Sequence, residues 1–206
     1  MYSYILDTKY AVCGLVTLIT EEENYLAQIQ REHKKSKEKE NSLRQRFEES
    51  HLNASLIEEQ AKYIAWYNSC KELANLQKKV VSLEMSINTK SVSINALCGA
   101  VLQIAKQGIS IKHSNPSSCP AGRIIGLENL RNVVLQGRNQ SLHYEEGEFK
   151  SAVKNCFNNL EISFGSKFPL SLNSGENLAY YIIELLGWKD YSTYENDLSE
   201  LLQDDS

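Results

Sequence analysis

The chain has 206 residues, a formal net charge of −4, 42% hydrophobic residues and 23% charged residues. This composition is typical of a globular protein that buries a sizeable core, and it excludes an intrinsically disordered chain. The negative charge argues against a protein that coats nucleic acid by bulk electrostatics, although it leaves room for a local basic cleft.

The first fifty residues combine a short apolar stretch with a strongly charged one. Residues 11–19, AVCGLVTLI, are too short to cross a bilayer, and the acidic residues 21–23 that follow do not fit a signal peptide. The five cysteines are odd in number and contain no C-x-x-C pair, which is typical of reduced thiols. We therefore expect a cytoplasmic protein with no membrane partner.

Residues 30–42, QREHKKSKEKENS, contain no hydrophobic side chain, and Lys and Arg outnumber Glu. A helix of this composition has no face to bury, so we expect a solvated helical arm or linker; contact with an RNA backbone is the alternative. The expected division is an N-terminal segment with a charged helical arm at 1–50 and a helical domain at 51–206.

Apolar residues recur at helical spacing through the middle of the chain. A seam with steps of three and four predicts a helix packed lengthwise on another helix. Its members are Trp66, Leu73, Leu76, Val80, Leu83 and Ile87. The spacing repeats over residues 94–104, and Gly108 is expected to end that helix.

The C-terminal half alternates polar loops with further helical patterns. Residues 112–122 are rich in turn-forming residues and predict a loop. A short helix is expected over residues 124–134, ending at Gly137. Amphipathic stripes predict three more helices, over residues 149–160, 178–186 and 194–201, the second with Asn173 or Ser174 as its N-cap. No alternating pattern is strong enough to build a sheet, so the expected class is all-α.

Between two of these predicted helices stands RNQSLH, residues 138–143. An Arg followed by a His five positions later is a weak signal, since RFEESH at residues 46–51 has the same spacing; there the charged neighbours predict a helix surface and its end. Asn139 and His143 share a helix face, whereas Arg138 and His143 differ by about 140° on a regular helix. If Gly137 breaks the helix, Arg138 begins a new turn and reaches the same cleft.

These three side chains suit phosphodiester cleavage. Arg138 offers a charged fork that matches phosphate oxygens, and His143 can give or take a proton near neutral pH. Asn139 can orient the imidazole or the scissile group. The sequence shows no metal-ligand cluster, and RNA needs none, because its 2′-hydroxyl is an internal nucleophile.

RNQSLH, followed by YEEGEF and an amphipathic stretch, resembles the R-N-x-x-x-H signature of HEPN-domain proteins over residues 124–160. The resemblance implies an antiparallel helical bundle, here with a long N-terminal arm and additional C-terminal helices. It also implies a metal-independent endoribonuclease without a cofactor, acting as a homodimer with a composite site. Arg138 would contact the scissile phosphate, His143 would transfer protons, and Asn139 would be the motif's second polar position. Many HEPN proteins are toxins or antiviral defence effectors, which implies an antitoxin or defence-system partner.

The residues after the motif depart from one branch of that family. Some HEPN toxins carry, two residues after the histidine, a tyrosine that a nucleotidyltransferase antitoxin modifies; here Tyr144 follows His143 directly and Glu145 stands at that place. Regulation by that route is therefore not expected. Tyr144 could stack on a substrate base or pack on a helix, and Glu145 and Glu146 are interpreted as a solvated loop.

A polar turn between helices, with Asn139 as a cap, is the structural alternative for the motif. The functional alternative is a non-catalytic helical scaffold, or an RNA- or protein-binding HEPN protein with a vestigial motif. Such a scaffold would use the seam of residues 66–87 to bind a partner or a second copy.

Overall fold

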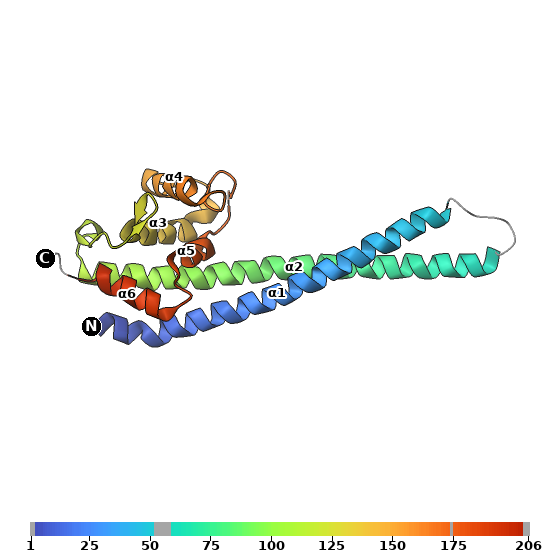
Figure 1. Ribbon diagram of the computed structural model, residues 1–206, viewed down its shortest axis with the longest axis horizontal. Helices are drawn as coiled ribbons and strands as arrows, with labels where there is room; N and C mark the ends of the chain where they lie inside the picture. Colours follow the sequence, from blue (N-terminus) through green and yellow to red (C-terminus); the bar gives the residue numbers. More distant parts are fainter. Residues whose placement is uncertain (1–2, 52–58, 174, 204–206) are drawn as a thin grey trace. The chain divides into compact units, whose positions relative to one another are not determined.

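The computed structural model describes residues 3–51, 59–173 and 175–203, and Figure 1 shows that helices dominate them. The elements are α1 (Ser3–His51), α2 (Glu59–Lys112), η1 (Pro116–Ser118), β1 (Ile124–Ile125), β2 (Glu128–Asn129), α3 (Leu130–His143), η2 (Tyr144–Glu146), α4 (Ser151–Phe164), α5 (Ala179–Leu186) and α6 (Tyr191–Leu201). The predicted all-α class is confirmed, with one two-stranded hairpin as the exception among these residues.

The chain forms two compact units, and both long helices contribute to each. The core unit comprises Met1–Glu22 and Val92–Ser206, and the arm unit comprises Glu23–Ser91. These units divide the chain differently from the expected segments 1–50 and 51–206. The beginning of α1 belongs with the C-terminal helices because it packs on the end of α2, where the Tyr4 hydroxyl donates to the Ile104 carbonyl at 2.7 Å.

In the arm unit, α1 and α2 are joined largely by charged side chains. Lys39 pairs with Glu72 at 2.8 Å, and Lys79 pairs with Glu32 at 2.8 Å. The charged residues 30–42 are helical, as expected, and of these only Ser36 is buried. The segment is therefore one side of a helical pair and not an isolated arm.

The predicted apolar seam of α2 is present in part. Val80 is buried, and Leu73, Leu76, Leu83 and Ile87 are half-buried. Trp66, its expected first member, is 40% exposed. Its ring lies 5.8 Å from that of Tyr63, so it belongs to an exposed aromatic surface at the start of α2.

One 18-residue window within Tyr63–Lys112 of α2 is long and apolar enough to cross a membrane by length and composition, and 39% of that window is buried inside the protein. The core helix of a folded domain meets the same criterion. The part of α2 in the core unit has such a role, because Cys98, Val101, Leu102 and Ala105 have no exposed surface.

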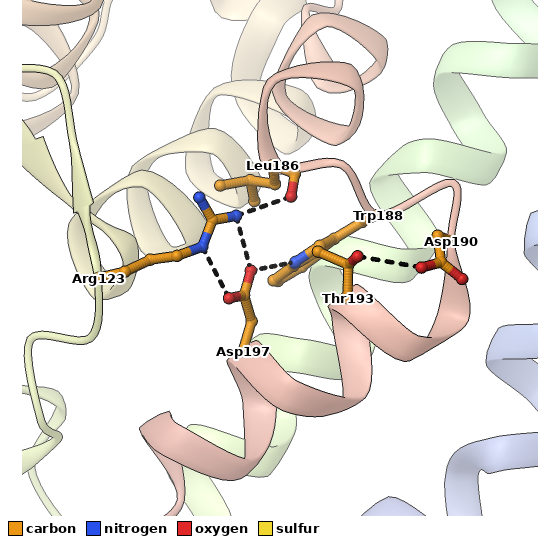
Figure 2. Close-up of polar contacts among 6 residues, drawn as sticks. All are labelled: Arg123, Leu186, Trp188, Asp190, Thr193 and Asp197. Atoms are coloured by element: carbon orange, nitrogen blue, oxygen red, sulfur yellow. Dashed lines mark hydrogen bonds and ion pairs between the residues drawn. The ribbon is translucent and has the colours of Figure 1, made fainter.

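A polar cluster around buried Asp197, shown in Figure 2, connects parts of the core unit that are distant in sequence. Asp197 of α6 accepts from Arg123 Nε at 2.8 Å, from Arg123 Nη2 at 2.9 Å and from Trp188 Nε1 at 2.7 Å. Arg123 Nη2 also donates to the Leu186 carbonyl at the end of α5. These bonds, the first of which is the main cause of the raised pKa of Arg123, fix the segment before α3 against both C-terminal helices.

The helix expected over residues 124–134 is wrong in its first half. Ile124 pairs with Asn129 and Ile125 with Glu128 in an antiparallel hairpin. Gly126 has a φ of 61°, and a Cβ there would lie 2.5 Å from the Ser163 side chain, so this turn requires glycine.

The two glycines expected to end helices lie inside them. Helix α2 continues past Gly108 to Lys112, and α3 continues through Gly137. A Cβ on Gly108 would lie 2.7 Å from the Tyr4 ring, and one on Gly137 would lie 3.1 Å from Ile182. At both positions the absence of a side chain lets a residue of a neighbouring helix approach closely. The prediction that these glycines end their helices was wrong.

Candidate active site

The motif residues 138–143 form the last part of α3. The helix begins with Asn129, whose side chain accepts from the Asn132 N–H at 3.0 Å. It packs against α4 and α5, and Figure 1 shows the three helices. Because α3 is continuous at Gly137, the prediction that Arg138 starts a new turn is wrong, and so is the alternative of a polar turn with Asn139 as a cap.

Arg138 is half-buried and held at two of its three guanidinium nitrogens. Nε donates to Gln103 Oε1 of α2 at 2.7 Å, and Nη1 donates to Asn139 Oδ1 at 3.2 Å. Within the described part of the chain, Nη2 has no hydrogen-bond partner. Since Asn139 and His143 are four positions apart, the bond to Asn139 holds the guanidinium on the side of the helix that His143 shares.

His143 is the last residue of α3 and is exposed. Its Nδ1 lies 2.6 Å from Glu146 Oε1, and the two side chains are 50% and 63% exposed. A carboxylate only accepts hydrogen bonds, so Nδ1 carries the proton and the lone pair of a neutral ring is on Nε2. This is the arrangement of an oriented general base.

Glu145 and Glu146 are exposed, as expected of a solvated loop, but the bond between Glu146 and His143 was missed. The signal for it is the His-x-x-Glu spacing, which places both side chains within one turn. Glu145 instead accepts from the Tyr144 hydroxyl at 2.9 Å. That bond is the main cause of the raised pKa of Tyr144, a half-buried residue at the start of η2.

Asn139 belongs to a ladder of polar side chains along α3. Its Nδ2 donates to Gln136 Oε1 at 3.3 Å, and Gln136 Nε2 donates to Asn132 Oδ1 at 3.2 Å. Asn132 in turn donates to Glu128, a carboxylate only 9% exposed, at 2.7 Å. Asn139 thus orients the guanidinium of Arg138, and none of its bonds reaches the imidazole.

The middle of the motif is structural. Gln140 has no exposed surface, and its Nε2 donates to the Glu176 carbonyl at 2.7 Å. Its Oε1 accepts from the Leu178 N–H at 2.9 Å, just before α5 begins. These bonds tie the segment before α5 to α3 and leave Arg138 and His143 at the surface of a fixed scaffold.

The expected N-cap of α5 was wrong. Helix α5 begins at Ala179, whose N–H donates to Asn177 Oδ1 at 2.9 Å, and Tyr180 N–H donates to Asn95 Oδ1 at 3.1 Å. Asn173 instead donates to the Pro169 carbonyl, and Ser174 lies outside the described residues.

Among the residues that the structure describes, no three His, Cys, Asp or Glu side chains are grouped as metal ligands. No protein-family model, no curated protein and no solved structure matches this chain.

Proposed function

We propose that the protein is a metal-independent endoribonuclease of the HEPN type that uses no cofactor and acts on RNA. The observation that carries this proposal is the end of α3, where His143 is oriented by Glu146 and Arg138 keeps one terminal nitrogen without a partner. A proton-transfer group and a phosphate-binding group are thereby presented by the same short segment.

In the proposed reaction, Nε2 of His143 takes the proton of the 2′-hydroxyl as its oxygen attacks the adjacent phosphorus. The bond from phosphorus to the 5′-oxygen breaks, and that oxygen leaves with a proton from a general acid. The products are a 2′,3′-cyclic phosphate and a 5′-hydroxyl. Glu146 stabilises the imidazolium formed in the first step, and Arg138 stabilises the added charge on the phosphate oxygens.

A homodimer would complete this chemistry. One copy offers one histidine at the motif, and a second proton-transfer group is needed for the leaving oxygen. Leu142, between the proposed catalytic residues, is 54% exposed. An exposed apolar side chain at this place supports the proposal that a second copy of the chain packs over the end of α3. We place the two copies of Arg138 and His143 around the two-fold axis, as the resemblance implies.

The resemblance further suggests a cytoplasmic toxin or antiviral defence effector controlled by a partner protein. A direct test of that role is controlled expression in a bacterial host. Growth arrest with wild-type protein but not with the His143→Ala variant is expected. Equal growth with both, at equal protein levels and without RNA cleavage, would count against it.

The test of the activity is RNA cleavage in EDTA by the wild-type protein and the His143→Ala variant, after circular dichroism and light scattering have shown both to be folded dimers. Wild type alone should cleave and leave 2′,3′-cyclic phosphate ends. Equal cleavage by both proteins would identify a contaminant, and no cleavage of any RNA class would overturn the proposal.

The alternative is a non-catalytic binding or scaffold protein, and one observation favours it. At the start of α2 the exposed fractions of Tyr63, Ile64 and Tyr67 are 64%, 59% and 56%. Such a group of apolar side chains is typical of an interaction surface. A scaffold should lose self-association or partner binding with Tyr67→Glu and be unaffected by Arg138→Ala, whereas the enzyme should show the reverse pattern in activity.

A further inference from the structure

A cavity of about 380 Å³, lined by both polar and apolar residues, lies beside α4 in the core unit. Its volume falls within the range of about 300–1,000 Å³ that is usual for small-molecule sites. Its walls come from α4, from the segment before it and from the segment after it. They include Phe149, Lys154, Asn158, Glu161, Leu170 and Ser171.

The side chains of α4 give this cavity both signs of charge. Lys154, Asn158 and Glu161 follow one another by four and three positions, which places them on one face of the helix. All three are exposed, and none forms a side-chain hydrogen bond or ion pair within the described ranges. The contrast is Asn159 on the neighbouring face, which donates to buried Glu128 at 2.8 Å. A cation, an amide and a carboxylate are thus all available to a ligand.

Two apolar side chains complete the cavity. Phe149 and Leu170 are both half-buried and line it from different segments. An aromatic ring beside unpaired polar groups is the combination with which proteins hold an unstacked nucleobase, the ring on the base face and the polar groups on its edge.

The cavity is adjacent to the proposed catalytic residues. Gly147 belongs to its lining and directly follows Glu146, the partner of His143. His143 and Gly147 are separated by the one-turn helix η2, whose rise limits the distance along its axis to about 8 Å. A nucleotide whose phosphate is at His143 can therefore place a neighbouring base at the cavity.

We propose that this cavity binds a guanine base of the RNA substrate next to the scissile phosphate; this inference rests on the proposed ribonuclease function. Guanine presents two donors, N1–H and the N2 amino group, beside two acceptors, O6 and N7. Glu161 accepts from the donors, and Lys154 donates to the acceptors. Adenine, cytosine and uracil lack the adjacent pair of donors, so each of them has only one donor group to give to the carboxylate.

The experiment has a cleavage arm and a binding arm. Cleavage in EDTA is compared on RNA oligonucleotides that differ only in one base beside the cleaved bond. Binding of guanosine and adenosine 5′-monophosphate is measured by titration calorimetry on the wild-type and His143→Ala proteins. The variants are Glu161→Gln and, as a matched control, Asp7→Asn, which removes an exposed carboxylate outside the cavity lining.

We expect wild type to cleave the guanine oligonucleotide at least ten-fold faster than the others and to bind guanosine monophosphate at least ten-fold more tightly than adenosine monophosphate. Glu161→Gln should abolish both preferences, and Asp7→Asn should keep them. Phe149→Leu should weaken nucleotide binding irrespective of the base, which tests the cavity without changing its charge.

The failures of the two proposals are distinguishable. Cleavage without base preference, together with equal or absent binding of both nucleotides, would overturn the guanine site and leave the ribonuclease in place. Guanosine monophosphate binding that needs Glu161, in a protein that cleaves no RNA, would support the site and overturn the ribonuclease. Preference and binding that survive both Glu161→Gln and Phe149→Leu would assign guanine recognition elsewhere and overturn the cavity proposal.

Discussion

Among the residues that the structure describes, each unit holds one bonded histidine–glutamate pair, and the two pairs differ in their surroundings. In the arm unit, His33 Nε2 lies 3.1 Å from Glu84, and that carboxylate also pairs with Lys37 at 3.6 Å. The His33 side chain is 20% exposed and links two helices. In the core unit, His143 is 50% exposed, and its carboxylate partner lies three residues further on. The same pair of residue types joins helices in one unit and presents a ring nitrogen to solvent in the other.

The two units also differ in how many apolar side chains they bury. Of the described residues in the arm unit, Ile29 and Val80 are the buried apolar ones. The core unit buries large side chains from every α-helix, among them Phe157 and Tyr194, and it also buries Trp188 between α5 and α6. Stability and site geometry should therefore depend on the core unit, while the arm unit should tolerate the loss of single pairs.

The largest expected effect is on catalysis. His143→Ala should lower the RNA cleavage rate by about 10²- to 10⁴-fold, because it removes the proposed general base. His33→Ala, which breaks the corresponding pair of the arm unit, should leave the rate unchanged. Initial rates on one RNA at equal dimer concentration measure both, and an equal loss in the two variants would show that the pairs do not differ in function.

The next effect is on stability. Asp197→Ala should lower the free energy of unfolding by about 3 kcal/mol, because it leaves Arg123 and the Trp188 N–H without their buried acceptor. Glu84→Ala, its counterpart in the arm unit, should cost less than about 1 kcal/mol, since that carboxylate is 46% exposed. Urea unfolding followed by tryptophan fluorescence and circular dichroism compares the two, and similar losses would contradict the contrast in packing.

A smaller effect on activity separates Glu146 from its neighbour. Glu146→Gln should reduce the cleavage rate about ten-fold, because a neutral amide stabilises the imidazolium less well than a carboxylate. Glu145→Gln, which changes the bond to Tyr144 instead, should have little effect on the rate. The ratio of the two rates at one pH is the measurement, and a ratio near one would remove Glu146 from the mechanism.

The smallest effects are expected at two helical glycines of the core unit. Gly137→Ala should destabilise the protein by about 1 kcal/mol, because its methyl group would crowd fully buried Ile182. Gly14→Ala should stabilise it by about 0.5–1 kcal/mol, since nothing lies within 4 Å of its Cβ position. Thermal unfolding measures the change in stability of each variant. Stabilisation by Gly137→Ala would mean that α3 and α5 have room to separate.

The sequence predicted the helical class and most of the buried stripes, because apolar spacing reports directly which face of a helix is covered. Val153, Cys156, Phe157 and Leu160 are buried as that spacing indicates. It did not predict the path of the chain at Gly108 and Gly137. Glycine fits both a helix end and a close helix contact, and the choice depends on Tyr4 and Ile182, which are distant in sequence.

The same limit applies to the site. RNQSLH indicated three polar side chains, but their spacing could not show that Gln103 and Asn139 would hold the guanidinium. Nor could it show that Gln140 would be buried against the Leu178 N–H, because that partner becomes a neighbour only through tertiary packing. Local pattern located the motif, and long-range contacts assigned each side chain its role.

The bonds of Gln140 have a consequence for biosynthesis. During translation the motif leaves the ribosome before residues 176–178, which provide the partners of this buried amide. Arg123 is likewise synthesised before its partner Asp197, which lies 74 positions later in the chain. Until α5 and α6 have emerged, the end of α3 lacks the contacts that fix its geometry, so a nascent chain does not yet hold Arg138 and His143 in the positions they have in the folded protein.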